Sequence, residues 1–220
     1  MEVRDLSELS LEGRGDELML MIYDLTMMLD ERTPMFPQCP KQIIKQVATI
    51  ADKGWNETQI TCSSHFGTHM DAPFHMLEEG KKLTDFPVDK FFGSAVVIDV
   101  RGKQEIDADL GLVQKDDIVF FCTGHAANAY RTTYYESNPV LAPALAERLV
   151  EKRVKMVGLD SWTPDNAPFT LHKLFFRHDI VIAENLVNLE PLIGKRFQCF
   201  VLPMKIKDAD GAPCRVVAIL

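Results

Sequence analysis

Three histidines and a carboxylate are concentrated in one short stretch of this chain. The chain has six histidines, and half of them fall within eleven residues, with an aspartate among them. Imidazole nitrogens and carboxylate oxygens are ligands that Zn²⁺ and other first-row divalent ions accept. Histidine is also well suited to transfer protons near neutral pH. The stretch therefore predicts a catalytic metal site built from His65, His69, Asp71 and His75.

The spacing within the stretch limits the local structures that can bring these side chains together. A continuous helix is disfavoured because the stretch contains Gly67 and Pro73. A strand would place all four on one face, since their numbers are all odd, but Pro73 indicates that the strand ends near it. We therefore expect a strand leading into a tight turn, where His65, His69 and Asp71 converge. Gly67 would let the backbone approach closely there.

The make-up of the cluster argues against a purely structural role. A single histidine is more often a core or surface residue than a ligand, but three histidines and an aspartate around a glycine change that balance. Structural zinc sites favour cysteine and close all four coordination positions. The five cysteines are scattered and lack Cys-x-x-Cys spacing, so we expect reduced thiols in a cytosolic protein.

Composition excludes several classes of function. The 220 residues are 46% hydrophobic and 25% charged, which is ordinary for a soluble globular protein. The formal net charge of -8 argues against a nucleic-acid surface, which needs a basic stripe. No run approaches the roughly 20 apolar residues that span a bilayer, and the N-terminus lacks the features of a signal peptide. We expect a cytoplasmic protein with a small-molecule partner, and no nucleic-acid or membrane partner.

The surrounding elements predict one strand-rich α/β domain over residues 19–220, preceded by an N-terminal arm over residues 1–18. A proline-rich loop is expected over residues 33–40. Helices are expected over residues 140–152, with Pro143 tolerated in the first turn, and over residues 171–178. Strands are expected over residues 21–25, 45–50, 58–62, 94–100, 116–122, 154–160, 180–184, 197–206 and 214–219.

The residues from His65 to His75 carry a family resemblance. Written as His-x-Gly-Thr-His-x-Asp-Ala-Pro-x-His, they are similar to the signature of the cyclase-like metal-dependent hydrolases, which include bacterial kynurenine formamidases and isatin hydrolases. The similarity runs from about Met21 to the C-terminus and includes Thr123-Gly124 and Gly158-Leu159-Asp160. It implies a swivelling β/β/α-type fold with a mixed, strand-rich sheet. It also implies a homodimer or homotetramer with the active site near the subunit interface.

The resemblance also implies two ligands far downstream. The family places a histidine and a glutamate twelve residues apart, which is the spacing of His172 and Glu184. His178 would then be a helix-end or surface histidine. Independently of the resemblance, Glu184 stands out because a carboxylate inside an apolar strand needs a cation or solvent. Strands 45–50 and 58–62 form a hairpin that leads into the histidine stretch, so we expect that hairpin to meet the strand of Glu184.

By the same resemblance the site holds two divalent ions per subunit, with Zn²⁺ favoured and Mn²⁺ an alternative. His75 would be the general acid/base and not a ligand. Five side chains would be the ligands: His65, His69 and Asp71 on the first ion, His172 on the second, and Asp71 and Glu184 on both.

The implied function is a metal-dependent amidohydrolase, in the first instance an arylformamidase that converts N-formylkynurenine to kynurenine and formate. Metal-activated water would attack the formyl carbon, and His75 would pass a proton to the leaving amine. Phe36 stands where such formamidases place a substrate-stacking tryptophan, and His125 is a further pocket candidate. Because Phe36 and His125 depart from the formamidase pattern, hydrolysis of a cyclic amide or lactone is an alternative. A non-catalytic metal- or small-molecule-binding protein is a third.

Overall fold

The structure of the protein is a computed structural model that describes residues 8–9 and 20–220. The N-terminal arm expected over residues 1–18 lies outside the described residues, apart from the short strand β1 (Glu8–Leu9). The backbone of β1 pairs antiparallel with β2 (Leu20–Asp24). Strand β2 in turn pairs antiparallel with the last strand of the chain.

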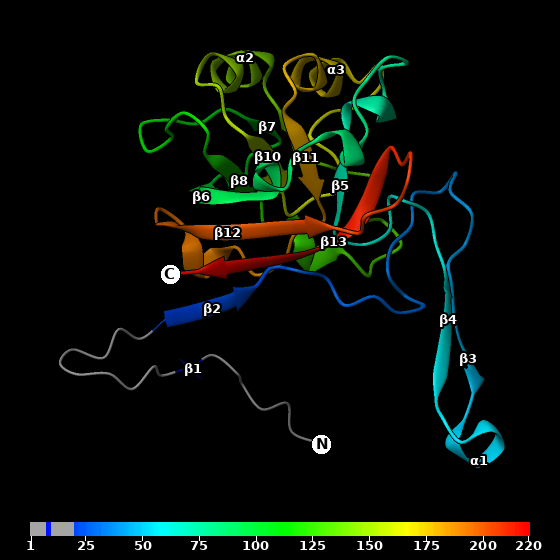
Figure 1. Cartoon of the computed structure of the whole chain (residues 1–220). Helices are drawn as coiled ribbons and strands as arrows, with labels where there is room; N and C mark the ends of the chain where they lie inside the picture. The colour runs from blue at the N-terminus through cyan, green and yellow to red at the C-terminus, as the bar shows by residue number, and fades with distance from the viewer. Residues whose placement is uncertain (1–7, 10–19) are drawn as a thin grey trace.

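A closed, barrel-like sheet forms the centre of the molecule (Figure 1). Around the ring the strands follow the order β13, β12, β6, β8, β10, β11 and β5, and β5 pairs again with β13. This confirms the predicted strand-rich α/β fold of the swivelling β/β/α type. The bounds of these strands are β5 His69–Asp71, β6 Phe92–Asp99, β8 Ile118–Cys122, β10 Met156–Leu159, β11 Val181–Glu184, β12 Arg196–Pro203 and β13 Gly211–Ile219.

The parallel part of the ring is apolar because both of its faces are covered. Strands β6, β8, β10 and β11 pair in parallel, and all five residues of β8 are buried. Ile118 and Phe120 point into one core cluster, whereas Val119 and Phe121 belong to a second cluster that also contains residues of the two longer helices. The alternation follows from the two-residue period of a strand.

Two helices, α2 (Pro143–Glu151) and α3 (Thr170–Arg177), cover one side of the ring (Figure 1). Helix α2 starts later than the expected residue 140, because Val140–Leu141 forms a short strand, β9, that pairs with β7 (Glu105–Ile106). Pro143 then opens the helix, where its missing N–H costs nothing. Short 3₁₀ turns connect other elements: η1 Pro73–His75, η2 Leu83–Asp85, η3 Val88–Phe91, η4 His125–Asn128 and η5 Glu190–Leu192. Within the described ranges, every helix is too short or too polar to cross a membrane.

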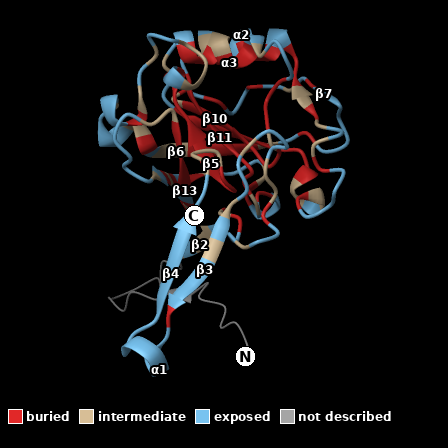
Figure 2. Cartoon of the chain, turned by 90° about the vertical axis from the view of Figure 1, so that its right-hand side faces the viewer, coloured by how far each residue is buried: buried red, intermediate tan, exposed pale blue. Residues whose placement is uncertain are grey.

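The predicted hairpin exists but points away from the barrel (Figures 1 and 2). It consists of β3 (Ile43–Ala48) and β4 (Glu57–Thr61), joined by the short helix α1 (Ile50–Lys53), and every residue of β4 is exposed. The expectation that this hairpin meets the strand of Glu184 is therefore wrong. The contact is made by the next strand, β5, which pairs antiparallel with β11 and places His69 opposite Glu184.

Candidate metal centre and active site

The histidine stretch forms a bend, a three-residue strand and a 3₁₀ turn, so the expected strand leading into a tight turn covers only its second half. His65 lies in the bend before β5, His69 and Asp71 are the ends of β5, and His75 ends the turn η1. Gly67 has a φ of +61°, and a Cβ there would lie 2.2 Å from Leu29 Cδ2. Only glycine fits this bend without strain. The bend is what allows His65 to fold back onto Asp71, as expected from the sequence.

Strand pairing and helix α3 bring the remaining side chains to the same place. His69 Nε2 lies 3.4 Å from Glu184 Oε2 and 3.3 Å from Asp71 Oδ1. His172, on α3, places Nε2 3.5 Å from Glu184 Oε1. His65 Nδ1 is 2.7 Å from Asp71 Oδ1. The structure thus brings together all five side chains that the sequence analysis singled out as ligands.

Three atoms at the centre of this cluster are buried and accept or donate no well-aligned hydrogen bond among the described residues: His69 Nε2, Glu184 Oε1, and Asp71 Oδ1, which lies 2.7 Å from His65 Nδ1 but outside hydrogen-bond geometry. Leaving two carboxylates buried in this way is costly unless a cation satisfies them. One ligand atom from each of His69, Asp71 and Glu184 lies within 4.8 Å of the others. Two carboxylates and several imidazoles are a suitable donor set for a divalent ion. The residues present therefore fit a metal centre.

The histidine tautomers are consistent with that fit. The Nδ1–H of His69 donates to the carbonyl oxygen of Gly67 at 2.8 Å, and the Nδ1–H of His172 donates to Asp165. Each bond leaves the Nε2 lone pair directed at the carboxylates. Such partners orient a ligating imidazole and raise its basicity. Sequence reasoning missed Asp165, because nothing in its proline-flanked loop indicates that it contacts His172.

Asp210 is a second residue that the sequence analysis missed. Its Oδ2 accepts from His65 Nε2 at 2.8 Å and from His75 Nδ1 at 3.0 Å, while Ser64 Oγ donates to Oδ1 at 2.9 Å. Asp210 lies between the strands expected over residues 197–206 and 214–219, in a segment for which no site residue was expected. Asp210 directly precedes β13, which begins at Gly211, three residues earlier than the strand expected from residue 214. Asp210 connects an expected ligand, His65, to the expected proton carrier, His75.

Electrostatics at the centre favour bound positive charge. Burial lowers the pKa of His65, but Asp71 and Asp210 outweigh it and raise that pKa to about 9. Burial likewise lowers the pKa of His172, but Asp165 and Glu184 raise it to about 9. The neighbouring His65 and His69 hold the pKa of Asp71 well below its usual range against the effect of burial. Protons and a cation therefore compete for the same atoms.

The cluster lies at one side of a cavity of about 440 Å³ that also carries several aromatic rings. Phe36, the residue expected to stack on the substrate, lines this cavity. His125 is not among its lining residues, so the expected substrate contact is corrected. The chain turns inward after Gly124, which has a φ of +77°, and buries His125 with Nε2 bound to the carbonyl oxygen of Tyr134.

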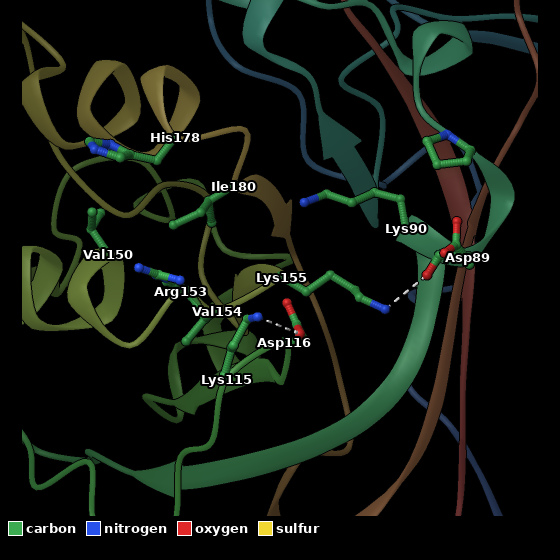
Figure 3. A pocket seen from close by; sticks show the side chains of 11 residues that line it. Asp89, Lys90, Lys115, Asp116, Val150, Arg153, Val154, Lys155, His178 and Ile180 are labelled. Carbon is green, nitrogen blue, oxygen red and sulfur yellow. Dashed lines mark hydrogen bonds and ion pairs between the residues drawn. The ribbon is translucent and has the colours of Figure 1, made fainter.

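A second hollow, of about 470 Å³, contains none of the candidate site residues (Figure 3). Two of its basic side chains already have oxygen partners: Lys155 Nζ donates to the carbonyl oxygens of Asp89 and Phe92, and Lys90 Nζ donates to that of Asp179. His178 lies at its edge, after the last residue of α3, and its Nδ1 donates to the carbonyl oxygen of Leu174. The expectation of a helix-end histidine is confirmed.

The sequence of this chain matches a known protein family and curated relatives. The family model described as "Putative cyclase" matches residues 23–166. A kynurenine formamidase from Geobacillus thermodenitrificans (strain NG80-2) is 32% identical over 199 residues, covering 87% of this chain and 94% of that relative.

Solved structures share the architecture. One described as a potential metal-dependent hydrolase with cyclase activity is 26% identical, with a TM-score of 0.76 over 91% of this chain and 98% of that chain. An isatin hydrolase bound to thioisatinate is 21% identical and shares the fold, with a TM-score of 0.82 over 91% of this chain and 92% of that chain. The histidine stretch lies inside the matched region, and this chain belongs to the cyclase family.

Proposed function

We propose that the protein is a metal-dependent amidohydrolase, and specifically an arylformamidase that releases formate from an N-formylated aromatic amine such as N-formylkynurenine. The observation that carries this proposal is the set of buried, unsatisfied ligand atoms on His69, Asp71 and Glu184 beside a cavity lined by aromatic rings. The relative from Geobacillus, named kynurenine formamidase, supports the substrate.

Two divalent ions would be held by the five converging side chains, with Zn²⁺ favoured over Mn²⁺. His65, His69 and Asp71 would hold one ion, His172 the other, and Asp71 with Glu184 would bridge them. Ions bound there would supply Lewis-acid activation of water and of the substrate carbonyl.

His75 is the proton carrier in this proposal. Its Nδ1–H donates to Asp210, which fixes the ring and leaves Nε2 as the nitrogen that exchanges a proton. The ring lies partly exposed on the wall of the cavity, beside His65 at a centroid distance of 4.0 Å. A proton given from Nε2 to the departing nitrogen would let the amine leave in neutral form.

Two substitutions test the roles separately. His75→Ala is expected to retain its metal but to lose about 10²- to 10⁴-fold in kcat, because only proton transfer is removed. Asp71→Ala is expected to lose both metal and turnover, because it removes the carboxylate common to both groups of ligands. Metal content by elemental analysis and formate release are the measurements, with His178→Ala as the unaffected control. Near-normal turnover in His75→Ala would sink the assignment.

Hydrolysis of a cyclic amide or lactone is the second candidate. It is favoured by the fold shared with isatin hydrolase, and the same residues could serve attack on either carbonyl. Assaying N-formylkynurenine, isatin and a simple lactone side by side, after metal removal and reconstitution ion by ion, separates the two candidates. If N-formylkynurenine is hydrolysed fastest, the result supports an arylformamidase. If isatin or the lactone is opened faster, the protein is instead a hydrolase of cyclic amides or lactones.

A further inference from the structure

Three aromatic rings from separate parts of the chain meet beside the metal centre. Phe36 comes from the proline-rich loop, Tyr135 from the segment after η4, and Trp162 from the loop between β10 and α3. The ring centroids of Phe36 and Trp162 lie 5.7 Å apart at an interplanar angle of 35°, and those of Tyr135 and Trp162 lie 5.3 Å apart at 63°. Phe36 and Tyr135 meet edge to face at 5.8 Å. We call these three rings the aromatic wall.

The aromatic wall lines the same cavity as the candidate ligands. The loop of Trp162 is tied to them on both sides. Ser161, its neighbour, accepts through its carbonyl oxygen from the N–H of Asn185 at 2.9 Å, next to Glu184. Asp165, three residues later, orients His172. Trp162 is therefore held in a defined position relative to the two downstream ligands.

Trp162 also carries a polar group that packing alone does not explain. Its Nε1 is buried and has no hydrogen-bond partner among the described residues. A buried indole N–H usually has an acceptor, because leaving it unsatisfied is costly. By contrast, Nε1 of Trp55, the other tryptophan, lies 3.4 Å from Glu57 Oε2 on the exposed hairpin. Nε1 is itself inaccessible from the cavity in this structure, so an acceptor on a ligand would satisfy it once the Trp162 side chain turns towards the bound ring.

We propose that Trp162 is a specificity-determining residue: the aromatic ring of the substrate packs against the aromatic wall, and Trp162 Nε1 donates to an acceptor on the substrate. This proposal deepens the proposed function. Its kinetic consequences rest on the proposed amide hydrolysis, whereas its binding consequences do not. Flat rings pack on such surfaces in offset or edge-to-face geometry, which a saturated ring cannot reproduce. The wall thus selects aromatic over aliphatic amides.

Kinetics with two matched substrates test the selection. N-phenylformamide and N-cyclohexylformamide differ in whether the six-membered ring is flat or puckered. Trp162→Leu is expected to lower kcat/KM for N-phenylformamide by roughly 10- to 100-fold and to change that for N-cyclohexylformamide much less. Trp162→Phe keeps an aromatic ring but removes the N–H, so its kcat/KM for N-phenylformamide is expected to lie between those of the native protein and Trp162→Leu. An equal loss for both substrates in both variants overturns the proposal.

Binding gives an independent test that needs no turnover. Trp55 is 57% exposed and lies on the hairpin, so Trp55→Phe leaves Trp162 as the sole tryptophan fluorophore without touching the site. In this variant, stripped of metal with a chelator, N-phenylformamide is expected to change the emission saturably and at lower concentration than N-cyclohexylformamide. Selective binding without hydrolysis would contradict the proposed function alone. Absence of a saturable change, or equal binding of both compounds, would contradict the role of Trp162.

Discussion

Asp165 acts on the candidate metal centre through another residue. Its carboxylate accepts from His172 Nδ1 and also from the backbone N–H of Leu171 at 2.7 Å, in the first turn of α3. One side chain therefore both orients an expected ligand and satisfies a free N–H at a helix start. The two effects can be separated by measuring metal affinity and unfolding of the metal-free protein.

Asp165→Ala is expected to weaken metal binding by about 10- to 100-fold, because His172 loses the bond that fixes its tautomer and ring orientation. The metal-free protein should also lose about 1 kcal/mol of unfolding free energy, because the N–H of Leu171 loses its acceptor. Titration against a competing chelator and thermal unfolding are the measurements. Asp52→Ala, on the exposed hairpin, is the matched control, and equal affinities for the two variants would refute the prediction.

Strand β5 is the element on which the centre depends. It is only three residues long, yet it pairs with both β11 and β13 and so closes the ring. The antiparallel register places His69 opposite Glu184, and the two-residue period of the strand places Asp71 on the same face as His69. A slip of one residue would turn both side chains away from the site.

Gly211, the first residue of β13, is required for this pairing. A Cβ there would lie 2.8 Å from the backbone oxygen of Met70 and 3.0 Å from His65 Cε1. Gly211→Ala is expected to cost about 1–3 kcal/mol of unfolding free energy through overpacking and to lower metal occupancy as β13 shifts from β5. Denaturant unfolding and metal analysis are the measurements.

Gly111→Ala is the matched control for Gly211→Ala. The nearest atom to a Cβ at Gly111 is an oxygen of the Asp109 side chain, at 3.3 Å, which can move aside. The free energy of unfolding of this variant is expected to be close to that of the native protein, and the variant is expected to keep its metal. If the two variants behave alike, the close approach of β13 to β5 has no energetic importance.

At the scale of the whole molecule, the chain consists of a barrel with a buried core and a hairpin that extends away from it (Figure 2). An isolated two-stranded hairpin is marginally stable in water. The hairpin nevertheless exposes large apolar side chains, among them Ile50 and Ile60, and Ile60 lies opposite the partly exposed Ile44 on one face of the hairpin. Exposed apolar surface of this kind often marks an interaction site. The homodimer or homotetramer implied by the sequence resemblance stays a prediction. A substitution on the exposed hairpin can test it.

Ile60→Glu is expected to shift the native protein from dimer or tetramer towards monomer, because Ile60 is 62% exposed on β4 and a charge there would be buried on association. Sedimentation velocity over a range of protein concentrations is the measurement. Gln59→Glu adds the same charge on the opposite face of β4 and is expected to have a smaller effect. A native protein that sediments as a monomer at every concentration would contradict this prediction.

The sequence by itself determined the local part of the site. The residue types and their spacing between His65 and His75 are enough to predict metal ligands. The apolar runs of β8, β10 and β11 are long enough to predict strands. The family resemblance, carried by the same motif, added His172 and Glu184 to the expected ligands. All five converge in the structure, and the α/β fold is as predicted.

Only the tertiary structure decided the contacts that hold those residues in place. Asp210 lies 145 positions from His65 and 135 from His75, and its role follows from the pairing of β13 with β5. Trp162 joins the cavity because its loop is bound beside Glu184, whereas His125 is turned inward after Gly124. Periodicity in a sequence records which face of an element is buried. It does not record which distant element covers that face, and ring closure by strand pairing settles that question.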